Sequence, residues 1–137
     1  MVEFAGLHVG LKGSATLIVG EEHTAPKVGS GRVHVLATPV MINLIEAAAL
    51  AAVEHLLPAG QQSLGTLLNV SHTAATPVGM RVSAEAELIQ IEGRLLTFRV
   101  HAADAVERIG EGTHQRMIVT LERFDQRVQK KVAQIGK

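Results

Sequence analysis

TPVMINLIEAAALAAVEHLL, residues 38–57, contains no glycine and is rich in alanine, leucine, isoleucine and methionine. Thr38 and Pro39 stand at its start, and Pro58, Ala59 and Gly60 follow its end. Threonine can cap the free amides of a first helical turn, proline suits the first helical position, and proline and glycine stop a helix. The pattern therefore predicts a helix from Pro39 to Leu57, with Thr38 as its N-cap.

This helix is predicted to lie in the core of the protein. From Val40 to Val53 the only polar residues are Asn43 and Glu46, so nearly every face is apolar. A helix that is apolar all round is normally covered by other structure on most sides. A carboxylate in such a helix loses solvation unless it is paired, lies at a mouth or is functional, so Glu46 becomes a candidate site residue.

Segments of alternating apolar and polar residues flank the helix, and this alternation predicts β-strands. In the segment 64–73 both parities contain apolar residues, which predicts a strand covered on both faces. In the last strand Met117, Val119 and Leu121 form the apolar parity, which leaves His114 and Arg116 on a polar face open to solvent. The predicted strands are Ser14–Val19, Leu64–Thr73, Arg81–Leu88, Leu96–Ala102 and Arg116–Leu121, with loops at 21–31 and 104–111 and a short surface helix over 124–131.

One strand, a buried helix and four further strands predict a single α+β domain over residues 1–137. The expected architecture is a curved antiparallel sheet of about five strands wrapped around one central helix. Other α+β sheets share this periodicity, so the pattern alone does not single out one fold.

The composition excludes several classes of function. Lys plus Arg (13) balances Asp plus Glu (13), so the chain lacks the broad positive field that nucleic acid or an anionic membrane requires. The absence of cysteine excludes disulfides, thiolate nucleophiles and thiolate metal sites. The seven histidines show no short spacing typical of a metal site, apart from His114 near Glu111, so we expect no metal and no cofactor.

The chain is expected to be cytoplasmic and oligomeric. The longest apolar run, 47–53, is shorter than a membrane span, and Glu3 stands where a signal peptide is basic. Zero net charge combined with a mean hydropathy of +0.23 leaves apolar surface with little self-repulsion, which favours a homodimer or a larger homo-oligomer.

Four segments resemble the fluoroacetyl-CoA thioesterase-like family of hot-dog proteins. They are 36–46, 63–66, 70–77 and 109–116, and the similarity runs from about Val35 to Lys131. The stretch His72-Thr73-Ala74-Ala75-Thr76-Pro77, following a helix with Thr and Glu eight positions apart, is the most specific of them. The resemblance implies a hot-dog fold and an acyl-CoA substrate.

In that family a Thr, a Glu and a His form the catalytic set, and the matching motifs place them at Thr38, Glu46 and His72. The resemblance also places Gly65 and Arg116 at the substrate site, and Asn43 lies one turn before Glu46. The segment 27–34 departs from the family pattern, because it is short, glycine-rich and free of aromatic residues. The resemblance therefore implies thioester hydrolysis as a class and does not extend to fluoroacetyl selectivity.

Each of these residues also has a purely structural interpretation. Thr38 can be only an N-cap, His72 can be a hydrogen-bonded core histidine, and Asn43 can bind a neighbouring strand.

Eight residues of helix span about 12 Å, so Thr38 and Glu46 cannot touch on one straight helix. Either Thr38 lies on a loop that folds back, or the site is completed across a two-fold interface between subunits.

The sequence thus predicts an acyl-CoA thioesterase that converts a short or modest acyl-CoA to free acid and coenzyme A. Arg32, Arg94, Arg99 and Arg116 are candidates to bind the coenzyme A phosphates. Two other functions stay open. One is a hot-dog hydratase or dehydratase acting on acyl thioesters, and the other is a module that binds acyl-CoA or another ligand without turnover.

Overall fold

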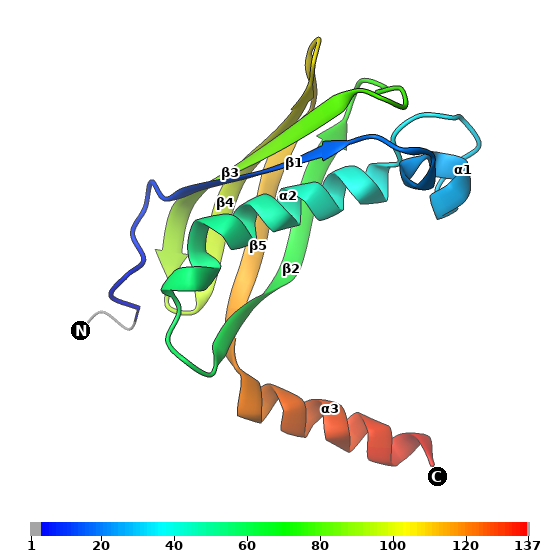
Figure 1. Ribbon diagram of the computed structural model, residues 1–137. Helices are drawn as coiled ribbons and strands as arrows, with labels where there is room; N and C mark the ends of the chain where they lie inside the picture. Colours follow the sequence, from blue (N-terminus) through cyan, green and yellow to red (C-terminus); the bar gives the residue numbers. More distant parts are fainter. Residues whose placement is uncertain (1–3, 137) are drawn as a thin grey trace.

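A computed structural model describes residues 4–136 as a curved antiparallel sheet with one long helix lying across its inner face (Figure 1). The sheet has five strands in the order β1-β3-β4-β5-β2, and every neighbouring pair is antiparallel. The strands are β1 (Lys12–Ile18), β2 (Gln61–His72), β3 (Arg81–Glu92), β4 (Leu95–Asp104) and β5 (Arg108–Thr120).

Five helical segments complete the structure. They are η1 (Glu21–His23), α1 (Ala25–Val28), α2 (Thr38–Val53), η2 (Glu54–Leu56) and α3 (Leu121–Ile135). The strands β3, β4 and β5 form a meander, whereas α2 and the loop after it lead the chain to the far edge of the sheet, where β2 pairs with β5. The predicted sheet around a single helix is confirmed.

Small residues allow α2 to lie close to the sheet. Gly13 of β1 faces the backbone of α2 so closely that a Cβ at this position would collide with Ala48 O and Ala52 N. The inner residues of α2, among them Met41, Ile45 and Val53, have no exposed surface and pack in one cluster with Phe98 of β4. Close packing of alanine and glycine thus builds a core that needs few aromatic rings.

The start of α2 differs from the prediction. Thr38 is the first residue of the helix rather than its N-cap, and the N-cap residue is Ala37. The Thr38 hydroxyl makes no capping bond, because it is directed at His72 instead. Thr38 also does not lie on a loop that folds back, which was one of the two arrangements considered for bringing it near Glu46.

Three predictions about the strands are wrong in this chain. β2 is an edge strand with exposed Leu64, Leu67 and Leu68, at 36%, 47% and 39%, rather than a strand covered on both faces. β5 begins at Arg108, so the predicted loop over 104–111 is shorter than expected. The inward residues of β5 are His114, Arg116 and Ile118, the opposite parity to the one predicted. Arg116 can be buried because Ser63 and Glu46 accept hydrogen bonds from its guanidinium.

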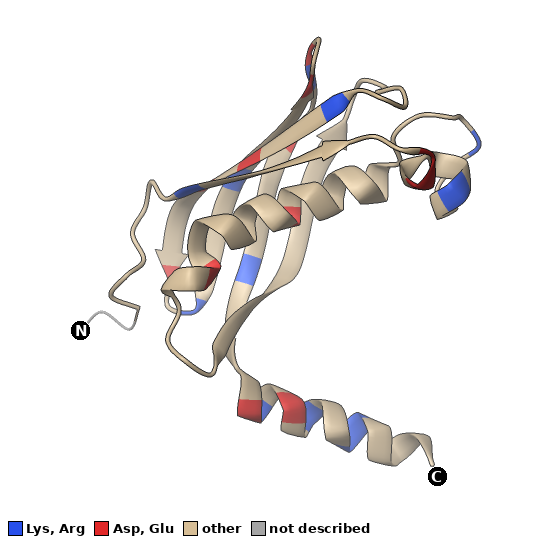
Figure 2. Ribbon diagram, in the orientation of Figure 1, with Lys and Arg blue, Asp and Glu red and all other residues tan. Residues whose placement is uncertain are grey.

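The helix α3 extends away from the sheet (Figure 1), and none of its residues is buried. It is longer than the predicted segment 124–131 and carries charges of both signs, whereas α2 is almost free of charge (Figure 2). The backbone N–H of Leu121, the first residue of α3, donates a hydrogen bond to the Gly60 carbonyl oxygen at 2.9 Å.

One helical stretch in residues 4–136, Thr38–Leu56, is long and apolar enough to cross a membrane, with a mean hydropathy of 1.4. This stretch is α2 with η2, and its inner residues form the core against the sheet. A core helix meets the same criterion of length and composition, so the stretch is weak support for a membrane span.

Candidate functional site

The first half of the candidate site joins the start of α2 to the end of β2. Thr38 Oγ1 lies 2.7 Å from His72 Nδ1, a short hydrogen bond between side chains that are 34 positions apart in the sequence. Helix α2 fixes Thr38 in its first turn, and the pairing of His72 with Gly110 of β5 fixes the histidine. The structure therefore brings together two of the three predicted catalytic residues.

The electrostatic surroundings of His72 favour its neutral form. Burial lowers the pKa of His72 below its ordinary value of 6.5, and the Ala74 backbone opposes this shift only in part. Nε2 of the ring is buried and has no hydrogen-bond partner among the described residues. A neutral histidine bonded to a hydroxyl can accept its proton, as a general base does.

A pocket of about 330 Å³ opens beside Thr38 and His72. One wall is the loop that follows α1, including Ser30, Arg32 and Val35, and the opposite wall is the segment 73–75 that follows β2. Both side chains of the pair therefore border a space that a small acyl group can enter.

The second half of the candidate site surrounds Glu46 in the middle of α2. Arg116 Nη1 donates to Glu46 Oε2 at 3.3 Å, and the two side chains are 5% and 34% exposed, respectively. The arginine is thus buried while the carboxylate keeps access to solvent. Arg116 binds this carboxylate through its Oε2.

Gly65 lies against this carboxylate. A Cβ at residue 65 would collide with Glu46 Oε2, and it would approach His114 Cε1 to 3.3 Å and Arg116 Nη1 to 3.4 Å. The predicted substrate-site residues Gly65 and Arg116 are thus brought together with Glu46. Asn43 is exposed one turn earlier on α2, and its side chain makes no hydrogen bond to the described residues.

His114 was expected on a solvated face, but it is fully buried in this cluster. Its Nδ1 lies 2.8 Å from the Leu67 carbonyl oxygen, which only accepts, so Nδ1 carries the proton and Nε2 accepts from Arg116 Nη1 at 3.2 Å. Burial is the largest cause that lowers the pKa of His114, and the positive charge of Arg116 lowers it further. The hydrogen bond to the Leu67 carbonyl and the negative charge of Glu46 oppose this shift. The ring is therefore neutral beside the guanidinium.

Ser63 and Glu54 belong to the same cluster, and sequence reasoning missed both. Ser63 is buried, accepts from Arg116 and donates to Glu54. Ser63 stands two residues before Gly65 in a motif that was recognised, but no spacing connects it with Glu54 at the end of α2. Only the three-dimensional return of β2 along α2 brings the two together.

The two halves of the site lie apart within one chain. His72 and Gly65 are seven residues apart on β2, which corresponds to about 23 Å along an extended strand. Thr38 and Glu46 are separated by about 12 Å along α2. A single chain therefore does not unite the Thr38–His72 pair with the Glu46–Arg116 pair.

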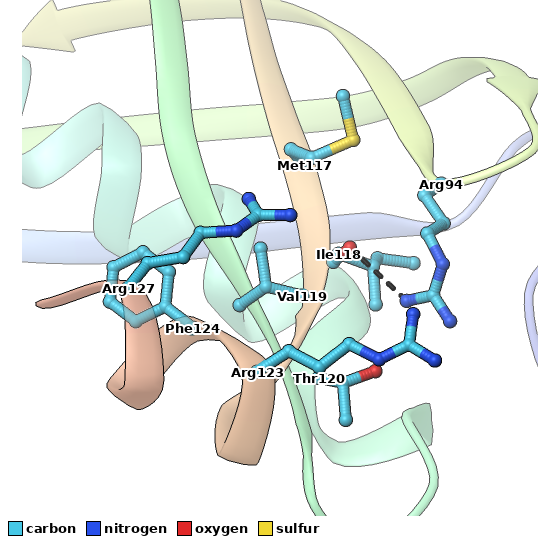
Figure 3. A pocket seen from close by; sticks show the side chains of 8 residues that line it. All are labelled: Arg94, Met117, Ile118, Val119, Thr120, Arg123, Phe124 and Arg127. Carbon is cyan, nitrogen blue, oxygen red and sulfur yellow. Dashed lines mark hydrogen bonds between the residues drawn. The ribbon is translucent and has the colours of Figure 1, made fainter. Parts of the chain in front are cut away.

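The four arginines considered for coenzyme A occupy different places. Arg32 borders the Thr38–His72 pocket, Arg116 is buried beside Glu46, and Arg99 pairs with Glu87 at 3.3 Å. Arg94 lines a separate groove of about 190 Å³ between β5 and α3, where Arg123 and Arg127 also project (Figure 3). Of the four, only Arg32 lies at the mouth of the Thr38–His72 pocket.

Within residues 4–136 no three His, Asp or Glu side chains are grouped as metal ligands. The side chains of the site offer a hydroxyl paired with a neutral imidazole in one half, and a carboxylate paired with a guanidinium in the other.

A curved antiparallel sheet around one helix defines the class of hot-dog proteins, and comparison with solved structures agrees. A structure of the fluoroacetyl-CoA thioesterase FlK superposes with a TM-score of 0.87 at 39% identity, covering 92% of this chain and 98% of that one. A thioesterase superfamily member from Thermus thermophilus, 24% identical, has the same fold with a TM-score of 0.87 over 94% of this chain and 96% of that one.

Sequence comparison narrows the class to a family. The model of the family described as fluoroacetyl-CoA-specific thioesterase matches residues 19–122, and the fluoroacetyl-CoA thioesterase of Streptantibioticus cattleyicolor is 47% identical over 97 residues, 71% of this chain and 70% of that protein. The chain belongs to this family of fluoroacetyl-CoA-specific thioesterases. The resemblance predicted from four motifs is confirmed, and the family match begins before Val35 and ends before Lys131.

Proposed function

We propose that this protein hydrolyses acyl-CoA thioesters with short or modest acyl groups to a free acid and coenzyme A. The observation that carries the proposal is the 2.7 Å contact between Thr38 Oγ1 and His72 Nδ1 at the edge of a pocket, in a chain of a thioesterase family. Solved structures of FlK variants include one with fluoroacetate and coenzyme A and one with acetyl-CoA, which supports a coenzyme A thioester as substrate here.

In the proposed mechanism His72 acts as a general base through Nδ1. When Thr38 donates its hydroxyl proton to Nδ1, the ring proton stays on Nε2 and the hydroxyl oxygen gains nucleophilic character. Either this oxygen or a water next to it attacks the thioester carbonyl, the C–S bond breaks, and the thiolate takes the proton held by His72 to leave as coenzyme A. If the Thr38 oxygen attacks, the acyl group is left as an ester on Thr38, and a water activated by His72 then hydrolyses this ester to release the free acid. The positive end of the α2 dipole favours the developing oxyanion.

The assignment of Thr38, Glu46 and His72 as one catalytic set requires a second subunit. β2 is an unpaired sheet edge in this chain, and it exposes Leu64, Leu67 and Leu68. Antiparallel pairing of two β2 strands about a two-fold axis near Leu68 would place the partner's Gly65 opposite His72. Each Thr38–His72 pair would then face the partner's Glu46, so a homodimer contains two complete sites.

Two parts of the proposal concern ligand and location. Arg32 at the pocket mouth is the strongest candidate among the four arginines for a coenzyme A phosphate, because arginine binds phosphate well and this side chain borders the catalytic pocket. Asn43 is proposed to contact substrate from the same exposed face of α2. We also propose that the protein works in the cytoplasm and binds neither nucleic acid nor membrane, in line with its balanced charge.

The deciding experiment measures free-thiol release from a panel of acyl-CoAs, from acetyl and fluoroacetyl to long chains. The wild type is compared with His72→Ala and Glu46→Gln, each checked for fold by circular dichroism. Thiol release that falls at least about tenfold in both variants supports the proposal. Enoyl-CoA hydration without thiol release would favour a hydratase. Stabilisation by acyl-CoA with no product would favour a binding module and overturn the proposal.

A further inference from the structure

The guanidinium of Arg116 is held by four acceptor atoms, from three residues, within the described part of the chain. Nε donates to Ser63 Oγ at 2.8 Å, Nη2 donates to Ser63 O at 3.0 Å, and Nη1 is shared between Glu46 Oε2 and His114 Nε2. Two of its three nitrogens therefore bind a single residue, Ser63. Those two bonds fix the plane of the guanidinium, and that plane determines where Nη1 points.

Ser63 is in turn fixed by Glu54. Its hydroxyl donates to Glu54 Oε1 at 2.6 Å and its backbone N–H donates to Glu54 Oε2 at 3.0 Å. Because the hydroxyl hydrogen is committed to Glu54, an oxygen lone pair of Ser63 is left to accept from Arg116 Nε. The carboxylate of Glu54 thereby sets the orientation in which Ser63 receives the arginine.

The arrangement connects two carboxylates, one from α2 and one from the following η2, through one arginine. Glu46 in the middle of α2 contacts Arg116 directly, and Glu54, eight positions later in η2, reaches it through Ser63. A buried guanidinium that loses an acceptor is costly, so Arg116 must turn toward another partner when Ser63 cannot accept. Any such turn moves Nη1 relative to Glu46.

We infer that Glu54 and Ser63 are positioning residues, which orient Arg116 and through it hold the Glu46 carboxylate at the Gly65 face of the site. This inference rests on the proposed function, in which Glu46 belongs to the catalytic set of the shared site. His114 completes the arrangement from the other side, because its neutral Nε2 accepts from the same Nη1 that binds Glu46. Among the described residues neither Glu54 nor Ser63 hydrogen-bonds to Glu46, so their effect passes through Arg116.

A double-mutant cycle tests this route. Ser63→Ala, Arg116→Gln and the double variant are assayed for thiol release, with Ser83→Ala, an exposed serine of β3, as the matched control. We expect Ser63→Ala to lower kcat about tenfold when Arg116 is present and less than about twofold when Arg116 is replaced. If the fold-losses in kcat of the two single variants multiply in the double variant, the inference is overturned. Ser63 would then act independently of the arginine and would only fix the loop after η2.

Nuclear magnetic resonance provides a readout that does not depend on turnover. The Nε–H signal of Arg116 should be sharp and slow to exchange in the wild type and in Ser83→Ala. It should broaden or exchange at least about tenfold faster in Ser63→Ala and Glu54→Ala. An unchanged signal in both variants contradicts the inference. If the wild type releases no thiol, the proposed function fails, whereas this measurement still decides whether Glu54 and Ser63 orient Arg116.

Discussion

Gly65 and Glu46 share one space: a Cβ on residue 65 would occupy the position of the Glu46 carboxylate oxygen Oε2. The two residues come from different elements, the edge strand β2 and the core helix α2. A glycine in the strand therefore allows an acidic side chain from the helix to reach the sheet and meet Arg116. This contact links the shape of the backbone directly to the chemistry of the proposed site.

Gly65→Ala is expected to lower activity while keeping the fold. The new methyl group would push Glu46 Oε2 away and loosen its contact with Arg116. Because displacement of a catalytic group by about 1 Å is costly, we expect kcat/KM to fall by about tenfold to a hundredfold. Thiol-release kinetics measure this loss, and circular dichroism verifies the fold.

The control for this prediction is the same substitution in a Glu46→Ala background. With the carboxylate removed, the methyl group has space, so Gly65→Ala should cost less thermal stability there than in the wild type. An equal loss of melting temperature in both backgrounds would show that the collision lies elsewhere.

Thr38→Val is expected to reduce kcat by at least about a hundredfold, because valine keeps the shape of threonine but loses the hydroxyl that contacts His72 Nδ1. Thr38→Ser keeps the hydroxyl and should retain most of the activity. Thr16→Val, an exposed position of β1, is the matched control for loss of a hydroxyl. Similar rates for Thr38→Val and wild type would remove Thr38 from the mechanism.

The sequence predicted the elements whose signals are local. The run of apolar residues between Thr38 and Pro58 identified the core helix, and alternation identified strands of the meander β3, β4 and β5. The matched motifs also selected Thr38 and His72, which the structure places in contact although 34 positions separate them. Periodicity and motif spacing are properties of short segments, and here they correspond to elements of the structure.

The parity of β5 could not be read in the same way. Alternation predicts Met117 and Val119 as the buried face, yet His114 and Arg116 point inward, because Ser63, Glu46 and the Leu67 carbonyl satisfy their polar groups. Those partners lie on α2 and β2, at least 47 positions away. Hydropathy treats a histidine and an arginine as solvated, and it carries no information about distant groups that compensate them.

The pH dependence of stability should follow from two histidines. Burial holds the pKa values of His72 and His114 below 6.5, the ordinary value that applies to the unfolded chain. Below pH 6.5 the unfolded chain therefore binds more protons than the folded one, so the free energy of unfolding falls as the pH decreases through this window. Urea titrations at pH 7.5, 6.5 and 5.5 measure the slope.

His114→Gln should make that slope shallower, since the variant lacks one of the two groups that resist protonation in the folded state. His8→Gln serves as the control, because His8 is exposed and its ring bonds to the neighbouring Val9 carbonyl. The depressed pKa of Asp104, whose burial is outweighed by bonds from Val106, Glu107 and Thr76, acts near pH 4 and below, outside this window. An unchanged slope in His114→Gln would contradict the assignment.

Removal of residues 126–137 is expected to leave the core intact. No residue of α3 is buried, and an isolated helix of this length is marginally stable in water. The melting temperature of the truncated chain should stay within about 3 °C of the full chain. Hydrogen exchange should also be fast in α3 and slow in α2, and equally slow exchange in both would show that α3 is covered in solution.

Complementation between inactive variants tests whether the site is shared between subunits. Thr38→Val removes the hydroxyl from one half of the site and Glu46→Gln removes the carboxylate from the other. In a mixed dimer, one of the two shared sites combines the intact Thr38–His72 pair with an intact Glu46 from the partner. Mixing the two variants after mild denaturation should therefore restore about a quarter of wild-type activity, since half of the dimers are mixed and each has one intact site.

Glu46→Gln mixed with His72→Ala should behave in the same way, whereas Thr38→Val mixed with His72→Ala should restore nothing, because both changes fall in the same half of the site. Recovery in that last mixture, or none in the first two, would contradict a site built across the two-fold axis.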